Sequence, residues 1–319
     1  MTVSLGRILG RSERFVSFTP PGLQNKEAAQ PVAGKMVEKG FRMALEDSRL
    51  ETLVPQLDEV ELELRGFAYE GAGFGLMVLD CLLPWRNHLR ALVDGPGAPY
   101  VYPLHVGAGL ALAKLNRRPE RYFARFDPFW RWQILDGYGF YLGVFFRQRT
   151  IEEKAIPAHI SDYALHVFDQ GVGRGIWFKA RGNISDLVTT IASFPPSRQA
   201  DLWAGVGFAC SYAGFIQERR FLEALQKAAG QYRLQLALAA AIAAGNRERF
   251  GNHAAHTDLA CEVFCGLSGE RAAYIVNRAL QELPIDNAEP AHKLWRERIE
   301  AKLAAQANDK QDSKIDISR

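Results

Sequence analysis

The chain has little cysteine: four residues among 319, at Cys81, Cys210, Cys261 and Cys265. Neither their number nor their spacing fits a disulfide scaffold or a Cys-x-x-Cys zinc site, so we expect reduced cysteines in the core. The sequence also lacks any stretch near twenty apolar residues without a charge, and its first residues lack an apolar segment followed by a cleavage site. We therefore expect a cytoplasmic protein with no stable membrane insertion.

An excess of charge is missing as well. The 39 Lys and Arg residues nearly balance the 36 Asp and Glu residues, which leaves a net charge of +3. So small and dispersed an excess gives no indication of a nucleic-acid partner. The hydrophobic share of 48% and the charged share of 24% are ordinary for a chain with a sizeable core, and they exclude the disordered, collagen-like and coiled-coil classes.

Familiar catalytic and cofactor motifs are absent too. The chain contains no Gly-x-Ser-x-Gly nucleophile elbow, no Asp-Asp-x-x-Asp run for magnesium and diphosphate, and no Walker lysine. Two glycine-rich runs, GAGFG and GVGRG, lack both the spacing and the preceding strand of a dinucleotide-binding turn. His253, His256, Cys261 and Cys265 match no known ligand spacing. We therefore expect neither a metal nor a cofactor.

What the sequence has in quantity is helical periodicity. Apolar residues recur at intervals of three and four, which is typical of amphipathic helices, whereas strand alternation is scarce. Proline and glycine separate these segments. The sequence therefore predicts an all-α protein. The clearest helical segments are 33–45, 76–92, 106–115, 221–244 and 259–267.

The two halves of the chain resemble each other. The run GAGF that begins at Gly71 is matched by GVGF at Gly205, 134 residues later. Leu104 and Leu234, 130 residues apart, are each followed by an asparagine twelve positions on. A register kept over about 100 residues favours an internal duplication, with two helical units of about 130 residues packed with pseudo-two-fold symmetry. The alternative is that Gly- and Ala-rich helices resemble one another through composition alone.

This duplication divides the chain into parts, and we expect the two repeats to form one body. Apolar residues thin out from Ala305 onward, so the end of the chain cannot bury enough surface to offset the entropy lost on ordering. The expected parts are an N-terminal arm (1–29), a first helical repeat (30–150), a second helical repeat (160–285), a C-terminal helix (286–304) and a disordered tail (305–319).

Ionisable residues embedded in apolar helical segments are the candidate catalytic groups, since a buried charge has to be paired, neutralised or functional. Glu70, His105 and Asp136 are such residues in the first half, and none has a charged equivalent in the second. We predict that they act as acid or base. The structural alternative is a helix-capping carboxylate or a hydrogen-bonded core imidazole.

Aromatic residues concentrate between Tyr122 and Phe146. Their helical spacing fits a core, but a dense aromatic wall also suits a long, apolar ligand. Arg174 can either clamp a carboxylate or neutralise a buried acid. The predicted substrate-binding residues are Asp80, Arg174, Trp132, Tyr138, Phe140, Trp177, Asp201, Trp203 and Tyr212.

Several sequence blocks together resemble a bacterial family called domain of unknown function 1702. The blocks are FAYEGA from Phe67, HVGAG from His105, DGYGF from Asp136, GVGR from Gly171 and DLWAGVG from Asp201. The resemblance spans about residues 35–300. Similar proteins occur in enediyne and related polyketide gene clusters, which implies a role in making or handling a polyene-derived natural product.

The resemblance and the aromatic segment lead to one functional hypothesis and one alternative. The hypothesis is a natural-product biosynthesis protein that binds a long apolar polyene or polyketide chain in a helical cavity, with a cofactor-independent cyclase or isomerase as its enzymatic form. The alternative is a non-catalytic helical interaction module that docks onto a polyketide synthase.

Overall fold

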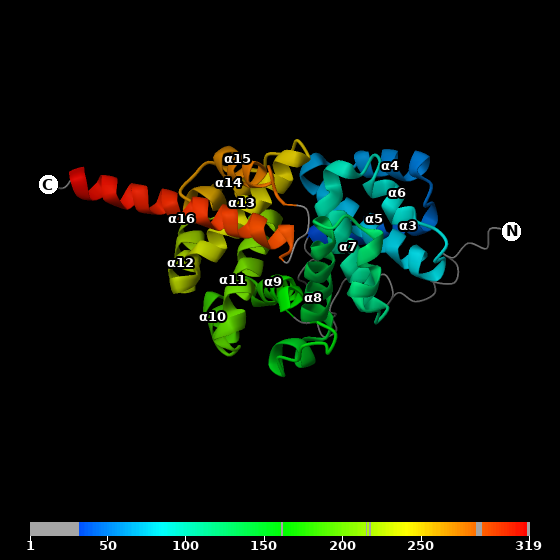
Figure 1. Cartoon of the computed structure of the whole chain (residues 1–319), viewed down its shortest axis with the longest axis horizontal. Helices are drawn as coiled ribbons and strands as arrows, with labels where there is room; N and C mark the ends of the chain where they lie inside the picture. The colour runs from blue at the N-terminus through cyan, green and yellow to red at the C-terminus, as the bar shows by residue number, and fades with distance from the viewer. Residues whose placement is uncertain (1–31, 161, 215, 217, 285–288, 318–319) are drawn as a thin grey trace. The chain divides into compact units, whose positions relative to one another are not determined.

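The computed structural model describes residues 32–160, 162–214, 216, 218–284 and 289–317 (Figure 1). Within these ranges every regular element is a helix, which confirms the all-α prediction. No helix in the described part of the chain has both the length and the apolar composition needed to cross a membrane. The predicted N-terminal arm lies outside the described residues.

The chain folds as two compact units, one ending at Gly171 and the other beginning at Val172. The division falls inside a helix, α9, whereas the sequence analysis places it between residues 150 and 160. The first unit contains α3 (Val32–Glu46), α4 (Leu50–Asp58), α5 (Leu62–Leu82), α6 (His88–Val93), η1 (Ala98–Tyr100), α7 (Val101–Lys114), η2 (Pro119–Arg125), η3 (Trp130–Trp132), α8 (Gln133–Phe145), η4 (Gln148–Glu152) and the first part of α9 (Asp162–Ala180).

The second unit contains the remainder of α9 and seven further α-helices. These elements are α10 (Ile184–Ala192), α11 (Pro196–Ala213), α12 (Arg219–Ala229), η5 (Gly230–Tyr232), α13 (Arg233–Arg249), α14 (Ala255–Phe264), α15 (Gly269–Ala279) and α16 (Ala291–Ile317). Here α16 packs against α13 and α15, and the buried Trp295 indole donates to the Val276 carbonyl at 3.1 Å.

Two of the predicted helical segments are interrupted. The segment 76–92 is broken after α5 at Leu82, just before Pro84, which cannot continue the helix. The segment 221–244 is broken at Gly230, whose φ of +56° belongs to the left-handed region that favours glycine. The α16 helix reaches Ile317 and so continues through most of the predicted disordered tail, which contains good helix formers such as Ala305 and Ala307.

Pairs of glycines separated by one residue let neighbouring helices touch through their backbones. In α5, a Cβ atom added at Gly71 would overlap the Val37 carbonyl of α3, and one added at Gly73 would overlap the Leu104 backbone of α7. The first glycine of the pair thus faces a helix earlier in the chain, and the second faces a later one. Only a hydrogen side chain permits so close an approach.

The same arrangement recurs along the chain. Gly107 of α7 faces the Glu70 carbonyl, and Gly109 faces Ile134 of α8. Gly137 of α8 faces Val106, and Gly139 faces Phe168 of α9. Within the second unit Gly173 faces Leu202 and Gly207 faces Leu236.

These glycine pairs define a shorter repeat than the sequence analysis anticipates. The first glycines of the pairs in α5, α7, α8, α9 and α11 are 36, 30, 34 and 34 residues apart. The sum of these four spacings is the 134-residue offset between Gly71 and Gly205. A shorter repeat, with one glycine-pair helix in each copy, therefore accounts for much of the constant offset on which the predicted duplication depends. Superposition of the two halves stays a prediction.

All four cysteines are free; Cys210 and Cys261 are buried as expected, but Cys81 and Cys265 are only half-buried.

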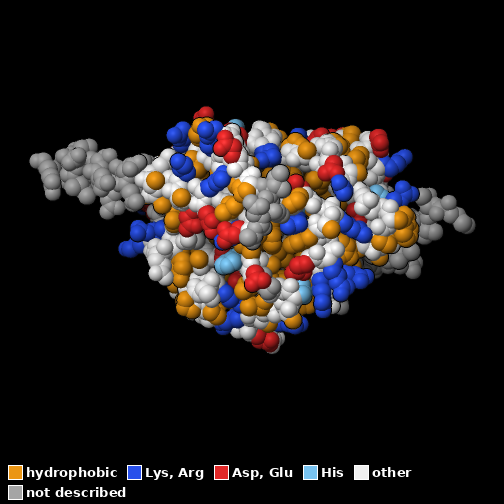
Figure 2. All heavy atoms as spheres, viewed as in Figure 1, with side chains coloured by type: hydrophobic (Ala, Val, Ile, Leu, Met, Phe, Trp, Pro, Cys, Tyr) orange, Lys and Arg blue, Asp and Glu red, His pale blue; other side chains and the backbone are white. Residues whose placement is uncertain are grey.

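Figure 2 shows Lys and Arg side chains gathered over the lower end of α7 as it appears in Figure 1. By sequence, the end of α7 and the η2 helix after it carry five basic residues, here named the basic cluster: Lys114, Arg117, Arg118, Arg121 and Arg125.

Candidate functional site

The three candidate catalytic residues are buried on helices of the first unit that pack on one another: Glu70 on α5, His105 on α7 and Asp136 on α8. The backbone of Glu70 contacts Gly107, and the residue following Asp136, Gly137, contacts Val106. The glycine pairs therefore bring the three positions to neighbouring helix crossings. Glu70 and Asp136 even occupy the same repeat position, immediately before the first glycine of a pair.

His105 is a neutral imidazole with one available nitrogen. Its Nδ1 donates to the Val101 carbonyl at 2.7 Å, whereas Nε2 has no hydrogen-bond partner among the described residues. Burial lowers the pKa of His105 to about 4, since the charged form loses its hydration. The ring lies edge-on to Phe126, with the centroids 5.1 Å apart. At neutral pH the Nε2 atom is thus a buried acceptor next to an aromatic side chain.

His105 is expected to make folding sensitive to acid. Its pKa is about 4 in the folded chain and near 6.5 when exposed, so between these values the unfolded chain binds a proton that the folded chain does not. The free energy of unfolding therefore falls as the pH is lowered from 6.5 to 4, and the whole contribution of His105 to this fall is about 3 kcal/mol. The variant His105→Gln should lose this part of the pH dependence when urea unfolding is compared at pH 7.5 and pH 4.5. An unchanged dependence would contradict the assignment; His292, whose pKa burial also lowers, contributes equally to both proteins.

Asp136 is paired inside the helical core. The Gln170 amide of α9 donates to its Oδ2 atom at 2.6 Å, and the carboxylate is fully buried. Gln170 stands immediately before Gly171, so it occupies in α9 the same repeat position that Asp136 occupies in α8. This pairing supports a structural part for Asp136 besides the predicted acid–base one.

The predicted substrate-binding residue Asp80 has the geometry of a helix cap. Its carboxylate accepts hydrogen bonds from the backbone N–H groups of His88 at 2.9 Å and Leu89 at 3.0 Å. It also contacts His88 Nδ1 at 2.8 Å. These bonds satisfy the free N–H groups at the start of α6. Asp80 therefore acts as a helix cap, which is the structural alternative to a functional role for a carboxylate in an apolar segment.

In the second unit, predicted residues take part in a stack of rings and cations. The Arg174 guanidinium lies 5.4 Å from the Phe208 ring centroid, and Phe208 stacks on Tyr212 at 5.3 Å. Arg247, which the sequence analysis does not single out, lies 4.8 Å from the Tyr212 ring. These contacts stabilise α11 against α9 and α13.

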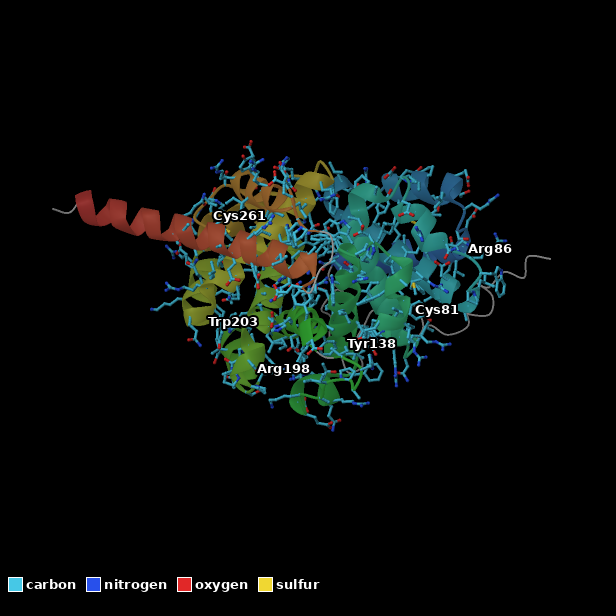
Figure 3. All side chains as sticks on the ribbon, viewed as in Figure 1. Cys81, Arg86, Tyr138, Arg198, Trp203 and Cys261 are labelled. Carbon is cyan, nitrogen blue, oxygen red and sulfur yellow. The ribbon has the colours of Figure 1, made fainter. Side chains whose placement is uncertain are left out.

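The remaining predictions in this unit fall on more ordinary positions. Trp177 is buried and its ring lies 6.0 Å from that of Phe221. Trp203, labelled in Figure 3, belongs to α11 and is buried. Asp201 is half-buried, and its charge contributes to the raised pKa of Glu300, for which burial is the larger cause.

The aromatic segment of the first unit is split between core and surface. Tyr138 and Phe140 on α8 are buried, whereas the aromatic residues before α8 are all half-buried. We call this second group the aromatic wall; η2 and η3, which carry most of it, pack on α8, and η3 also packs on α7. The aromatic wall consists of Tyr122, Phe123, Phe126, Phe129, Trp130 and Trp132.

Contacts between rings hold the aromatic wall together. Trp132 lies edge-on to Phe123 at 5.4 Å and to Tyr163 of α9 at 4.9 Å. Asp127 fixes the turn before η3, because its Oδ1 atom accepts from the backbone N–H groups of Phe129 at 2.9 Å and Trp130 at 3.0 Å. These contacts fix the positions of Phe123, Trp132 and the start of η3.

Two polar residues beside the wall were missed by the sequence analysis. Both carboxylate oxygens of Glu120 and the Nε2 atom of His159 are buried without a hydrogen-bond partner among the described residues, as is Trp132 Nε1. Glu120 belongs to the charged run RRPERYFAR, whose composition predicts a solvent-exposed segment. His159 lies in the connection between η4 and α9. No pattern in the sequence marks either one as buried.

No group of three or more His, Cys, Asp or Glu side chains in the described ranges could hold a metal ion. Comparison with curated proteins and with solved structures gives no match. A family model described as "Protein of unknown function (DUF1702)" matches residues 7–303, which is most of the chain. The chain therefore belongs to the DUF1702 family of proteins of unknown function.

Proposed function

We propose that this protein takes part in natural-product biosynthesis and binds a long apolar polyene or polyketide chain, with the aromatic wall as the main contact surface. The observation that carries the proposal is the half-burial of all six rings of the wall. Each of these rings keeps part of its surface open, and an apolar patch formed by several partly open rings is typical of a ligand-binding surface. The enediyne and polyketide association comes from the family resemblance.

The enzymatic form of the proposal is a cofactor-independent cyclisation or isomerisation of the bound chain. His105 is the candidate acid–base residue with a direct link to the wall, through its ring contact with Phe126. Its neutral Nε2 atom can accept a proton from a bound chain, and its low pKa makes it a weak base that returns the proton readily. Glu70 and Asp136 are the other two proposed acid–base groups, on the helices adjoining α7.

Replacement of Trp132 is expected to weaken polyene binding. Trp132 contacts two other rings, and it offers more apolar area than any other residue type of the wall. Titration with methyl parinarate, the uncharged ester of a fluorescent conjugated fatty acid, should give about tenfold weaker binding for Trp132→Ala than for the unmodified protein.

The matched control is Trp85→Ala. Trp85 is 72% exposed and lies outside the wall, between α5 and α6, so its removal should leave the affinity unchanged. Circular dichroism checks that both variants are folded. Equal loss in both variants, or no binding to the unmodified protein, would overturn the proposal.

A second candidate function, docking onto a polyketide synthase, is favoured by the basic cluster at the end of α7. Arg117, Arg118 and Arg121 are exposed there and can attract an acidic protein surface. Native mass spectrometry of the protein co-expressed with a neighbouring synthase separates the two functions. A bound polyene supports the binding protein, whereas a stable complex with the synthase and no small molecule supports the docking module.

A further inference from the structure

The strongest unexplained feature outside the predicted residues is the Glu120 carboxylate. Both of its oxygens are buried with no hydrogen-bond partner within the described ranges. A carboxylate without water or a donor is costly to bury, so its position calls for a compensating group.

The local geometry directs Glu120 toward the aromatic wall. Glu120 and Phe123 are three residues apart in the 3-10 helix η2, and side chains at this spacing lie on the same face. The Phe123 ring contacts Trp132 at 5.4 Å. The carboxylate therefore lies on the side of η2 that carries the wall.

Tyr138 and His159 adjoin the same region from other elements. Tyr138 of α8, labelled in Figure 3, is buried, and its ring centroid lies 5.9 Å from that of His159. The helix η2, which carries Glu120, packs on α8, which carries Tyr138. Burial raises the pKa of Tyr138, the negative charge of Glu120 raises it further, and the charge of Arg149 acts in the opposite direction. Tyr138 thus keeps its proton at neutral pH and remains a donor.

The unpartnered atoms differ in what they require. A carboxylate only accepts hydrogen bonds, the indole Nε1–H of Trp132 only donates, and His159 Nε2 does either. A hydroxyl group supplies both a donor and an acceptor. A second carboxylate would be repelled by Glu120, and a hydrocarbon would leave all of these atoms unpaired.

We infer that Glu120, with Trp132, Tyr138 and His159, recognises a hydroxyl group on a ligand whose apolar part lies on the aromatic wall. This inference rests on the proposed function and makes it more specific. The ligand class is a hydroxylated, otherwise apolar polyene.

The test compares parinaryl alcohol with methyl parinarate, which share the polyene but differ in the hydroxyl group. The unmodified protein should bind the alcohol at least tenfold more tightly. In Glu120→Leu this preference should disappear while the affinity for the ester is kept. Glu153→Leu, at an exposed glutamate of the same unit, should keep the preference.

A thermal melt provides a second readout. Removing a buried, unpartnered carboxylate should raise the Tm of Glu120→Leu by about 2–4 °C, whereas a structural carboxylate would lower the Tm when removed. If neither compound binds the unmodified protein, the proposed function itself fails. If both bind equally, or the preference survives in Glu120→Leu, or this variant melts lower, the hydroxyl site is wrong while the aromatic wall stands.

Discussion

Gly137→Ala is expected to unfold the first unit or to leave it barely stable. A Cβ atom at this position would lie 2.8 Å from the Val106 carbonyl carbon and closer still to its oxygen. Neither group can move aside, since both belong to helix backbones, so α7 and α8 would have to separate. We expect a loss of about 4 kcal/mol or more, measured by urea unfolding.

The sign of this effect is informative, because Ala normally stabilises a helix by about 1 kcal/mol relative to Gly. Gly207→Ala on α11 is the matched comparison. Its Cβ atom would meet the Leu236 Cα atom at 2.9 Å and the Ala239 Cβ atom at 3.0 Å, which calls for a smaller shift. The loss should therefore be clearly smaller at Gly207. A Gly137→Ala protein as stable as the unmodified one would show that α7 and α8 do not depend on backbone contact.

For the glycine pairs, the sequence predicts the offset between the two halves of the chain but not the shorter repeat within them. Glycine inside a helix is otherwise unfavourable, and in this structure the pairs lie where helix backbones touch. Comparison of two distant halves found the 134-residue offset but missed the intervening pairs at Gly107, Gly137 and Gly171. The residues around each pair differ too much for a single short repeat to stand out.

The polar residues show why burial alone does not reveal a role. Asp80 lies in an apolar segment of the sequence, as a functional carboxylate would. In the structure it caps α6, which begins eight residues later. Only the path of the chain through residues 83–87 brings those N–H groups to it. Glu120 is the reverse case: its neighbours in sequence are charged, and its burial comes from the packing of η2 on α8. Neither outcome follows from periodicity.

Arg247→Met is expected to destabilise the second unit by about 3 kcal/mol. The buried guanidinium donates to the Tyr212 carbonyl at 2.6 Å and lies 3.1 Å from His256 Nε2. It thereby donates a hydrogen bond and brings a positive charge to the end of α11, where free carbonyl groups carry the negative end of the helix dipole. Gly214, with a φ of +65°, turns the chain at this point. Met preserves much of the volume but removes the charged donor to the Tyr212 carbonyl, which His256 Nε2 also contacts at 3.2 Å.

The matched control is Arg233→Met, at an exposed position of the same helix, which should change the free energy of unfolding by less than about 0.5 kcal/mol. Arg247→Lys should fall between the two, because lysine keeps the charge but lacks the planar group that stacks on the Tyr212 ring. Urea unfolding of the three variants at neutral pH measures the order. If Arg247→Met were no less stable than Arg233→Met, the α11 terminus would not depend on the buried arginine, and the ring and cation stack would be incidental to folding.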